Sequence, residues 1–133
     1  MKTKTIKQSI TFKTSPHEVY EALMDEKKHS KFTGSKAKVS GRVSGSFSIF
    51  DGGLVGTNVE LVQDKRIVQA WKCVMDGWPE KHFSKAVFSL KPVKGGTKLD
   101  FTQTGVPEEC FEDISKGWKE YYWSKMKKLL EKQ

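Results

Sequence analysis

The sequence predicts an α+β domain in which a curved antiparallel sheet of about seven strands wraps around a long C-terminal helix. Two patterns support this prediction: short alternating runs of apolar and polar residues separated by glycine-rich or charged turns, and one continuous apolar helical stripe near the end of the chain. A length of 133 residues suits one hydrophobic core. No repeat, linker or low-complexity tract divides the sequence, so we expect a single domain over residues 1–133.

The first strand and the first helix follow from the N-terminal pattern. Residues 5–13 alternate apolar and polar side chains, which is typical of a strand with one face in water. The run Ser15–Glu18 then combines an N-cap serine, a proline at the first helical position and a capping-box glutamate, so a helix begins here. We expect the polar stretch 25–31 to end this helix before Phe32.

Six further strands are predicted to follow as an antiparallel meander. Glycine-rich or charged turns separate them, and each run alternates apolar and polar residues. In the longest of the early runs, 54–62, we expect every second residue from Val55 to Leu61 to share one face of the sheet. The six predicted strands are 36–40, 45–50, 54–62, 66–75, 82–91 and 97–104.

A final helix is predicted to begin at Pro107. Glutamates near its N-terminus and lysines near its C-terminus both complement the backbone dipole. Apolar residues recur at helical spacing over about six turns, so one face of this helix must cover the apolar face of the sheet. The residues of this face are Phe111, Ile114, Trp118, Tyr122, Met126, Leu129 and Leu130.

The predicted space between the helix and the curved sheet has two possible contents. Either aromatic side chains fill it as ordinary core, or it admits a hydrophobic ligand. Aromatic residues at helical spacing usually face a core, so packing and ligand contact stay open as alternatives for each of them. The candidate residues that would line such a cavity are Phe47, Trp71, Phe101, Trp118 and Tyr122.

The charge is concentrated at the two ends of the chain. The net charge is +8, and residues 1–42, 43–115 and 116–133 carry +6 (10 − 4), −2 (8 − 10) and +4 (6 − 2) respectively. A partner with an acidic surface fits this distribution. Nucleic acid is disfavoured because there are two arginines and no aromatic RNA-binding motif. The basic apolar run at the C-terminus also resembles membrane-surface or calmodulin-target helices, although any half-buried helix shows that pattern.

No catalytic or metal-binding pattern emerges. The chain has two cysteines, Cys73 and Cys110, without a short-spaced pair, and the histidines His17, His29 and His82 are equally scattered. No nucleophile motif or phosphate-binding loop occurs either. We therefore expect no enzyme activity, no metal and no cofactor.

The sequence also predicts a cytoplasmic protein. No apolar run approaches the ~20 residues that a transmembrane helix needs. Met1 is not followed by the apolar stretch of a secretory signal. We therefore expect no transmembrane segment and no export.

Two strings give the sequence a family resemblance. They are Trp78-Pro-Glu-Lys-His-Phe83 and Gly117-Trp-Lys-Glu-Tyr-Tyr-Trp123, supported by Ile67–Trp71 and Gly105-Val-Pro107. With these residues the sequence resembles the START-like superfamily, whose helix-grip fold is also called Bet v-type. Within it, the sequence is most similar to the activators of the heat shock protein 90 ATPase, and to the C-terminal domain of the eukaryotic activators in particular.

The resemblance implies a co-chaperone. Family members contact the N-terminal ATPase domains of heat shock protein 90, favour their closed state and belong to the stress response. The family's activators usually carry a second domain that contacts the chaperone's middle segment, so the strength of activation by this domain alone is left open. Because a partner meets exposed loops and charges, the candidate partner-binding residues are Trp78, Glu80, His82, Lys127 and Lys128.

Two alternatives stand beside the co-chaperone interpretation. The first is a carrier of a hydrophobic small molecule or lipid, which would use the space beneath the long helix as many START-like relatives do. The second is structural: Trp78 could simply close the end of the core, and Gly117 could allow close packing of the helix.

Overall fold

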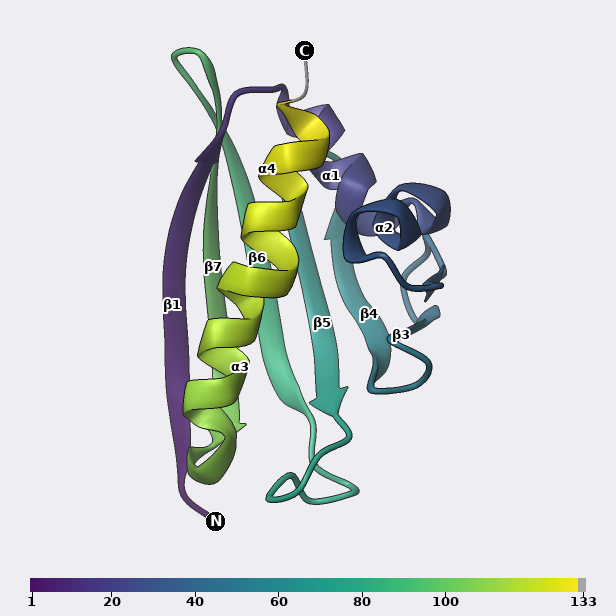
Figure 1. Ribbon diagram of the computed structural model, residues 1–133, viewed down its shortest axis with the longest axis vertical. Helices are drawn as coiled ribbons and strands as arrows, with labels where there is room; N and C mark the ends of the chain where they lie inside the picture. The colour runs from purple at the N-terminus through teal and green to yellow at the C-terminus, as the bar shows by residue number, and fades with distance from the viewer. Residues whose placement is uncertain (132–133) are drawn as a thin grey trace.

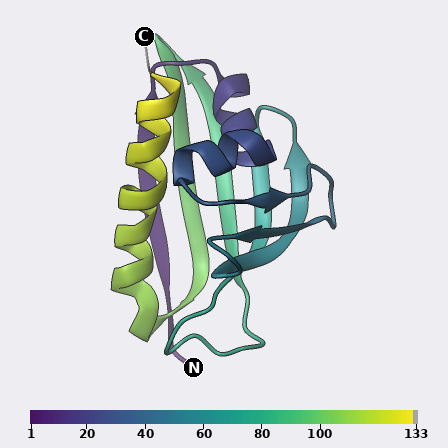
Figure 2. The ribbon, with the colours of Figure 1, turned by 45° about the vertical axis from the view of Figure 1, so that its right-hand side comes forward.

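The structure, a computed structural model, describes residues 1–131. Its strands form one antiparallel sheet in the order β1-β7-β6-β5-β4-β3-β2, and the helices lie on one side of this sheet (Figures 1 and 2). The strands are β1 (Thr3–Phe12), β2 (Lys38–Val39), β3 (Ser46–Ile49), β4 (Leu54–Val62), β5 (Arg66–Cys73), β6 (Ser84–Val93) and β7 (Gly96–Pro107). The helical segments are α1 (Pro16–Met24), α2 (Glu26–Thr33), η1 (Glu108–Cys110), α3 (Phe111–Gly117), η2 (Trp118–Trp123) and α4 (Ser124–Leu130).

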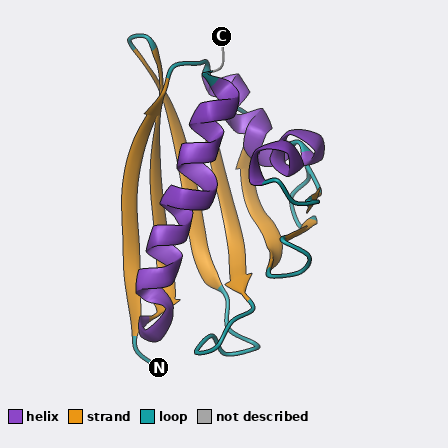
Figure 3. Cartoon of the chain, viewed as in Figure 1, coloured by secondary structure: helices purple, strands orange, loops and turns teal. Residues whose placement is uncertain are grey.

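The predicted fold class is confirmed. Figure 3 shows the helix from α3 to α4 lying along the inner face of the sheet, with the short helices α1 and α2 beside it. The core lies between this helix and the sheet, and many of its largest members are aromatic. Within residues 1–131, no helix combines the length and the apolar character needed to cross a membrane.

The first helix ends at Met24, at the start of the polar stretch 25–31 as predicted, but the stretch also forms a second helix that the sequence analysis did not predict. The Asp25 side chain accepts a hydrogen bond from the Lys28 backbone N–H (3.0 Å) and so begins α2 at the residue where α1 ends. Gly34, with φ of 72°, ends α2 in the left-handed conformation. The second helix was missed because the Asp25 cap starts it directly after the first, and a polar helix is stable when only a few residues, here including His29 and Phe32, are buried.

The prediction that apolar and polar residues alternate without interruption in β4 was wrong. The pairing of β4 with β5 shifts between Asn58 and Glu60, so that Val59 is exposed and Asn58 is fully buried. Asn58 Nδ2 donates to the backbone carbonyls of Ser40 (2.7 Å) and Arg42 (3.0 Å), and its Oδ1 accepts from Gln69 Nε2 (3.2 Å), which satisfies its buried polar atoms. This bulge turns the later part of β4 and fastens the β2–β3 turn to the sheet.

The long helix departs from regular α-helical geometry in its middle. Segment η2 is a π-helix, in which each backbone hydrogen bond joins residues five apart instead of four. As a result Trp118 and Trp123, five residues apart, both face the sheet and stack with ring centroids 5.3 Å apart and planes 18° apart. The π-helical segment therefore brings one more large aromatic ring into the core than a regular helix would.

Candidate functional site

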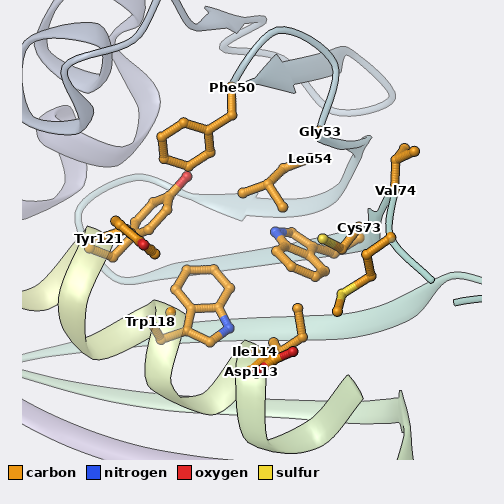
Figure 4. A pocket seen from close by; sticks show the side chains of 13 residues that line it. Phe50, Gly53, Leu54, Cys73, Val74, Asp113, Ile114, Trp118 and Tyr121 are labelled. Atoms are coloured by element: carbon orange, nitrogen blue, oxygen red, sulfur yellow. The ribbon is translucent and has the colours of Figure 1, made fainter. Parts of the chain in front are cut away.

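A pocket of about 440 Å³ lies between the long helix and the sheet. Figure 4 shows its walls: the α3–η2 helix on one side, the start of β4 and the end of β5 beneath, and the β3–β4 turn with the loop after β5 around the opening. The side chains that line it are almost all apolar or aromatic. Its volume is within the range of small-molecule sites in proteins.

Two tryptophans form the inner wall of the pocket. The ring centroids of Trp71 on β5 and Trp118 on η2 lie 5.5 Å apart, and both residues are 3% exposed. The Trp118 indole N–H donates to Gln103 Oε1 (2.8 Å), and Gln103 Nε2 donates to Ser84 Oγ (2.8 Å). Because the indole N–H of Trp118 is hydrogen-bonded to Gln103 on β7, the Trp118 ring presents an apolar surface to the pocket.

The opening of the pocket is bordered by an aromatic pair. Phe50 in the β3–β4 turn approaches Tyr121 of η2 with ring centroids 6.2 Å apart and planes 69° apart. Phe50 has φ of 54° and Asp51 has φ of 55°, a left-handed conformation that is unusual for a bulky residue such as phenylalanine. Tyr121 is 51% exposed, and Val74 across the opening is 61% exposed. The turn therefore holds Phe50 at the edge of the pocket at a cost in backbone strain.

A buried histidine joins α2 to the long helix next to this site. His29 Nδ1 lies 3.0 Å from the Leu23 carbonyl oxygen, and Nε2 lies 2.8 Å from the Tyr122 hydroxyl. Because a carbonyl only accepts, Nδ1 carries the hydrogen and Nε2 accepts from the tyrosine. Burial lowers the pKa of His29 to about 4, while burial raises the pKa of the Tyr122 hydroxyl. The pair is neutral at physiological pH.

We expect His29 to make the fold less stable in acid. Between pH 6.5 and about 4 the unfolded chain binds a proton that the folded chain rejects, so the free energy of unfolding falls as the pH is lowered through this window. From His29 the expected loss is about 1 kcal/mol at roughly pH 5.5 relative to neutral pH. Urea unfolding at both pH values measures it.

A matched pair of variants isolates this contribution. His29→Gln removes the titrating group, so the variant should lose less stability on acidification than the wild-type protein does. His17→Gln is the control, because the His17 side chain is exposed and paired with Asp64 on the surface. Equal pH dependence in wild type and His29→Gln would contradict the prediction.

The structure brings only part of the predicted cavity set to this pocket. Trp71, Trp118 and Tyr122 line it. Phe47 lies instead beside a second, much smaller cavity of about 20 Å³ deeper under the helix. Phe101 lines neither cavity. Its ring belongs to the core and packs against Trp118, with ring centroids 4.4 Å apart.

Sequence reasoning did not assign the opening of the pocket. Phe50, Val74 and Met75 lie within the predicted strands 45–50 and 66–75, but the observed strands end before them at Ile49 and Cys73, so alternation did not mark them as the border of a pocket. Asp113 and Tyr121 lie on the polar edge of the helical stripe. The residues in question are Phe50, Leu54, Val74, Met75, Asp113 and Tyr121.

The loop between β5 and β6 holds three predicted partner-binding residues in different environments. Trp78 is 6% exposed, packs on Trp71 with ring centroids 5.7 Å apart and donates to the His82 carbonyl (2.8 Å). His82 is half-buried, and its Nε2 lies 2.6 Å from the Gly105 carbonyl oxygen. Trp78 therefore closes the end of the core, which is the structural role that the sequence analysis gave as an alternative to partner binding. Its ring does not reach the surface. Glu80 is exposed.

The two predicted lysines of the long helix also differ. The Lys127 ammonium donates to the Thr11 carbonyl (3.0 Å) on β1 and lies 3.7 Å from the Glu131 carboxylate. Lys128 is exposed. Lys127 thus fastens the end of the helix to the sheet while remaining partly exposed, and Lys128 is the more exposed of the two.

The titratable groups near the pocket form no metal site. Among residues 1–131, no group of three or more histidine, cysteine or acidic side chains could hold a metal ion. Burial, reinforced by Cys110, raises the pKa of Cys73 to about 11. The Cys73 thiol at the pocket wall is therefore protonated at neutral pH and a weak nucleophile.

The family of this chain follows from comparison with known protein families. Residues 13–131 match the family model described as Activator of Hsp90 ATPase homolog 1-like protein. The chain belongs to this family. The family resemblance inferred from the sequence strings around Trp78 and Gly117 is confirmed.

Curated relatives in the Hsp90-activator family are longer proteins. The chain is 32% identical over 120 residues to human Activator of 90 kDa heat shock protein ATPase homolog 1, an alignment that covers 90% of this chain and 35% of the human protein. It is 31% identical over 120 residues to mouse Activator of 90 kDa heat shock protein ATPase homolog 2, covering 90% of this chain and 36% of the mouse protein. The chain spans about a third of the length of these relatives.

Solved structures share the fold. A crystal structure of an HSP90 activator from Plasmodium falciparum superposes with a TM-score of 0.89 at 24% identity, covering 96% of each chain. The solution structure of the Aha1 dimer from Colwellia psychrerythraea superposes with a TM-score of 0.82 at 22% identity, covering 97% of each chain. At these identities the likeness concerns the fold of the Hsp90-activator domain.

Proposed function

We propose that this chain is a co-chaperone domain that binds heat shock protein 90 and stimulates its ATPase activity in the cytoplasm. The observation that carries the proposal is the match of residues 13–131 to the activator family, together with relatives named as activators of the 90 kDa heat shock protein ATPase. The domain acts by binding, and the catalytic groups belong to the chaperone.

Binding can raise the ATPase rate through a population shift. A protein that binds the closed, hydrolysing conformation of the chaperone more tightly than the open one increases the closed fraction. The size of the shift is limited by the ratio of the two affinities, so a weakly binding domain produces a modest activation. This mechanism requires no reacting group on the co-chaperone.

The loop after β5 offers a surface for the partner. Phe83 is 49% exposed, and the Lys72 ammonium lies 5.9 Å from the centroid of its ring. Lys72 also contacts the carbonyl oxygen of Glu80, so the three residues form one exposed group. An aromatic ring beside a cation is typical of residues that dominate protein interfaces.

A titration into the chaperone's ATPase assay tests the proposal. We expect the hydrolysis rate of heat shock protein 90 to rise with added domain and to saturate, with association visible by light scattering. Absence of binding at concentrations on the order of tens of micromolar would remove the proposal.

The basic end of the long helix is expected to steer the association. The double variant Lys125→Glu with Lys128→Glu reverses two exposed charges and should weaken binding by roughly three- to tenfold at low salt. Added salt should weaken wild-type binding in the same way, because it screens exposed charges. Affinity measured by calorimetry at two salt concentrations checks this.

The control carries the same change in net charge at another place. Lys36→Glu with Lys38→Glu reverses two exposed lysines at the β2 edge of the sheet. If both double variants bind equally, the steering belongs to the overall charge and the helix end has no special part in it.

A second candidate function is the binding of a hydrophobic small molecule. The observation that favours it is the 440 Å³ pocket with its wall of Trp71 and Trp118. Native mass spectrometry of the purified protein should then show a bound small molecule in addition to the 15.1 kDa chain. A bare chain that also fails to bind added apolar compounds would exclude this function.

A further inference from the structure

The pocket is bordered by charge opposite to that of the whole protein. The chain carries a net charge of +8, yet Asp113 is the only charged residue among those that line the pocket within residues 1–131. Its carboxylate makes no ion pair with a basic side chain of that part of the chain. Figure 4 shows Asp113 next to Ile114 on the helix side of the pocket.

Three further acidic residues are neighbours of lining residues in the sequence or in the fold. Asp51 follows Phe50 in the β3–β4 turn, and Asp76 follows Met75 in the loop after β5. Glu109 lies one turn before Asp113, and its carboxylate lies against Gly77 of that same loop. All are exposed. The acidic residues thus come from each of the three elements that surround the opening.

The nearest basic residues do not line the pocket. Lys72 lies between the lining residues Trp71 and Cys73, but its ammonium contacts Glu80 and the ring of Phe83. Lys116 lies three residues after Asp113 and so near it on the helix surface, but it does not line the pocket and makes no ion pair with Asp113. Among residues 1–131, the charged side chain that lines the pocket is therefore acidic.

We propose that the pocket binds small amphipathic amines, with the apolar body against Trp71 and Trp118 and the ammonium group at the opening beside Asp113. The inference rests on the second candidate function and adds the charge of the ligand. Burial of the apolar body drives binding, while the ammonium stays at the solvent-exposed edge and avoids desolvation. The exposed ring of Tyr121 gives the cation a further contact. A carboxylate ligand would meet like charge in the same place.

Three probes with one apolar chain test the charge preference: decylamine, decanol and decanoate. Dissociation constants follow from intrinsic fluorescence, since Trp71 and Trp118 line the pocket, and from calorimetry. We expect decylamine, protonated at neutral pH, to bind roughly fivefold more tightly than decanol and decanoate to bind more weakly than decanol. Added salt should narrow these differences.

Two variants localise the effect. Asp113→Asn should weaken decylamine binding by roughly threefold and leave decanol binding unchanged. Asp100→Asn is the matched control, because this aspartate accepts from Ser9 (2.5 Å) on β1 and does not line the pocket. Equal affinity for all three probes would overturn the charge preference while leaving the pocket as an apolar ligand site. Failure of all three to bind would overturn the second candidate function as well.

Discussion

Gly56→Ala is expected to lower the free energy of unfolding by roughly 3 kcal/mol or more. A Cβ atom at position 56 would lie 1.9 Å from the Ala70 carbonyl oxygen on β5 and 2.6 Å from the buried ring of Phe47. Both neighbours are held in place, one by the backbone of a central strand and the other by the core. The new methyl group therefore forces β4 away from β5 or displaces the Phe47 ring.

The matched control is Gly41→Ala. Nothing lies within 4 Å of a Cβ atom at that position, and the residue is not in the left-handed conformation. Urea unfolding of the two variants should place Gly41→Ala within about 0.5 kcal/mol of the wild type. Similar stabilities for the two variants would show that the β4–β5 pair yields easily and that the packing around Gly56 is loose.

Much of the fold follows from local pattern. The alternation in β5, β6 and β7 and the capping box at Ser15 depend on residues close in sequence, and the predicted elements lie there. The face of β4 could not be read in the same way. Its alternation breaks at Asn58, whose buried amide is satisfied by the distant carbonyls of Ser40 and Arg42. Because this bulge depends on tertiary hydrogen bonds, no periodic pattern in the sequence predicts it.

The long helix, too, could be predicted from the sequence only in part. Its stripe Ile114, Trp118, Tyr122 and Met126 follows from spacing, and these residues are buried. Trp123 is five residues after Trp118, which in a regular helix places it about 140° away. The π-helical segment reduces that offset, because each of its residues turns the chain by less than about 100°. Spacing alone does not place Trp123 in the core, where its ring contacts Phe101 and Trp118.

The site was predictable in its inner part only. Trp71, Trp118 and Tyr122 face the core by periodicity, so any space under the helix had to touch them. The opening is made by Phe50 in a left-handed turn and by Val74 beyond the end of β5; both lie at the ends of predicted strands, where the observed strands stop earlier. The apolar wall thus follows from the packing of a helix against a curved sheet, whereas the border of the opening depends on the conformation of the turns that follow β3 and β5.

The last prediction concerns the polar residue that holds this wall. Gln103→Leu is expected to lower the free energy of unfolding by about 2–3 kcal/mol. Gln103 is fully buried, and the leucine would leave the indole N–H of Trp118 without an acceptor. Ser84 keeps its bond to the Trp71 carbonyl (2.9 Å), so most of the loss comes from the tryptophan.

A double-mutant cycle separates this bond from simple repacking. Trp118→Phe removes the indole N–H, so adding Gln103→Leu to it should cost about 1–2 kcal/mol less than Gln103→Leu costs in the wild-type protein. Thr104→Val, on the exposed face of the same strand, should change stability by less than about 0.5 kcal/mol. Unfolding by urea, followed by circular dichroism, measures all four variants. If the two core substitutions add independently, the Gln103–Trp118 bond contributes nothing to stability, and the orientation of the Trp118 ring at the pocket must come from the surrounding aromatic packing alone.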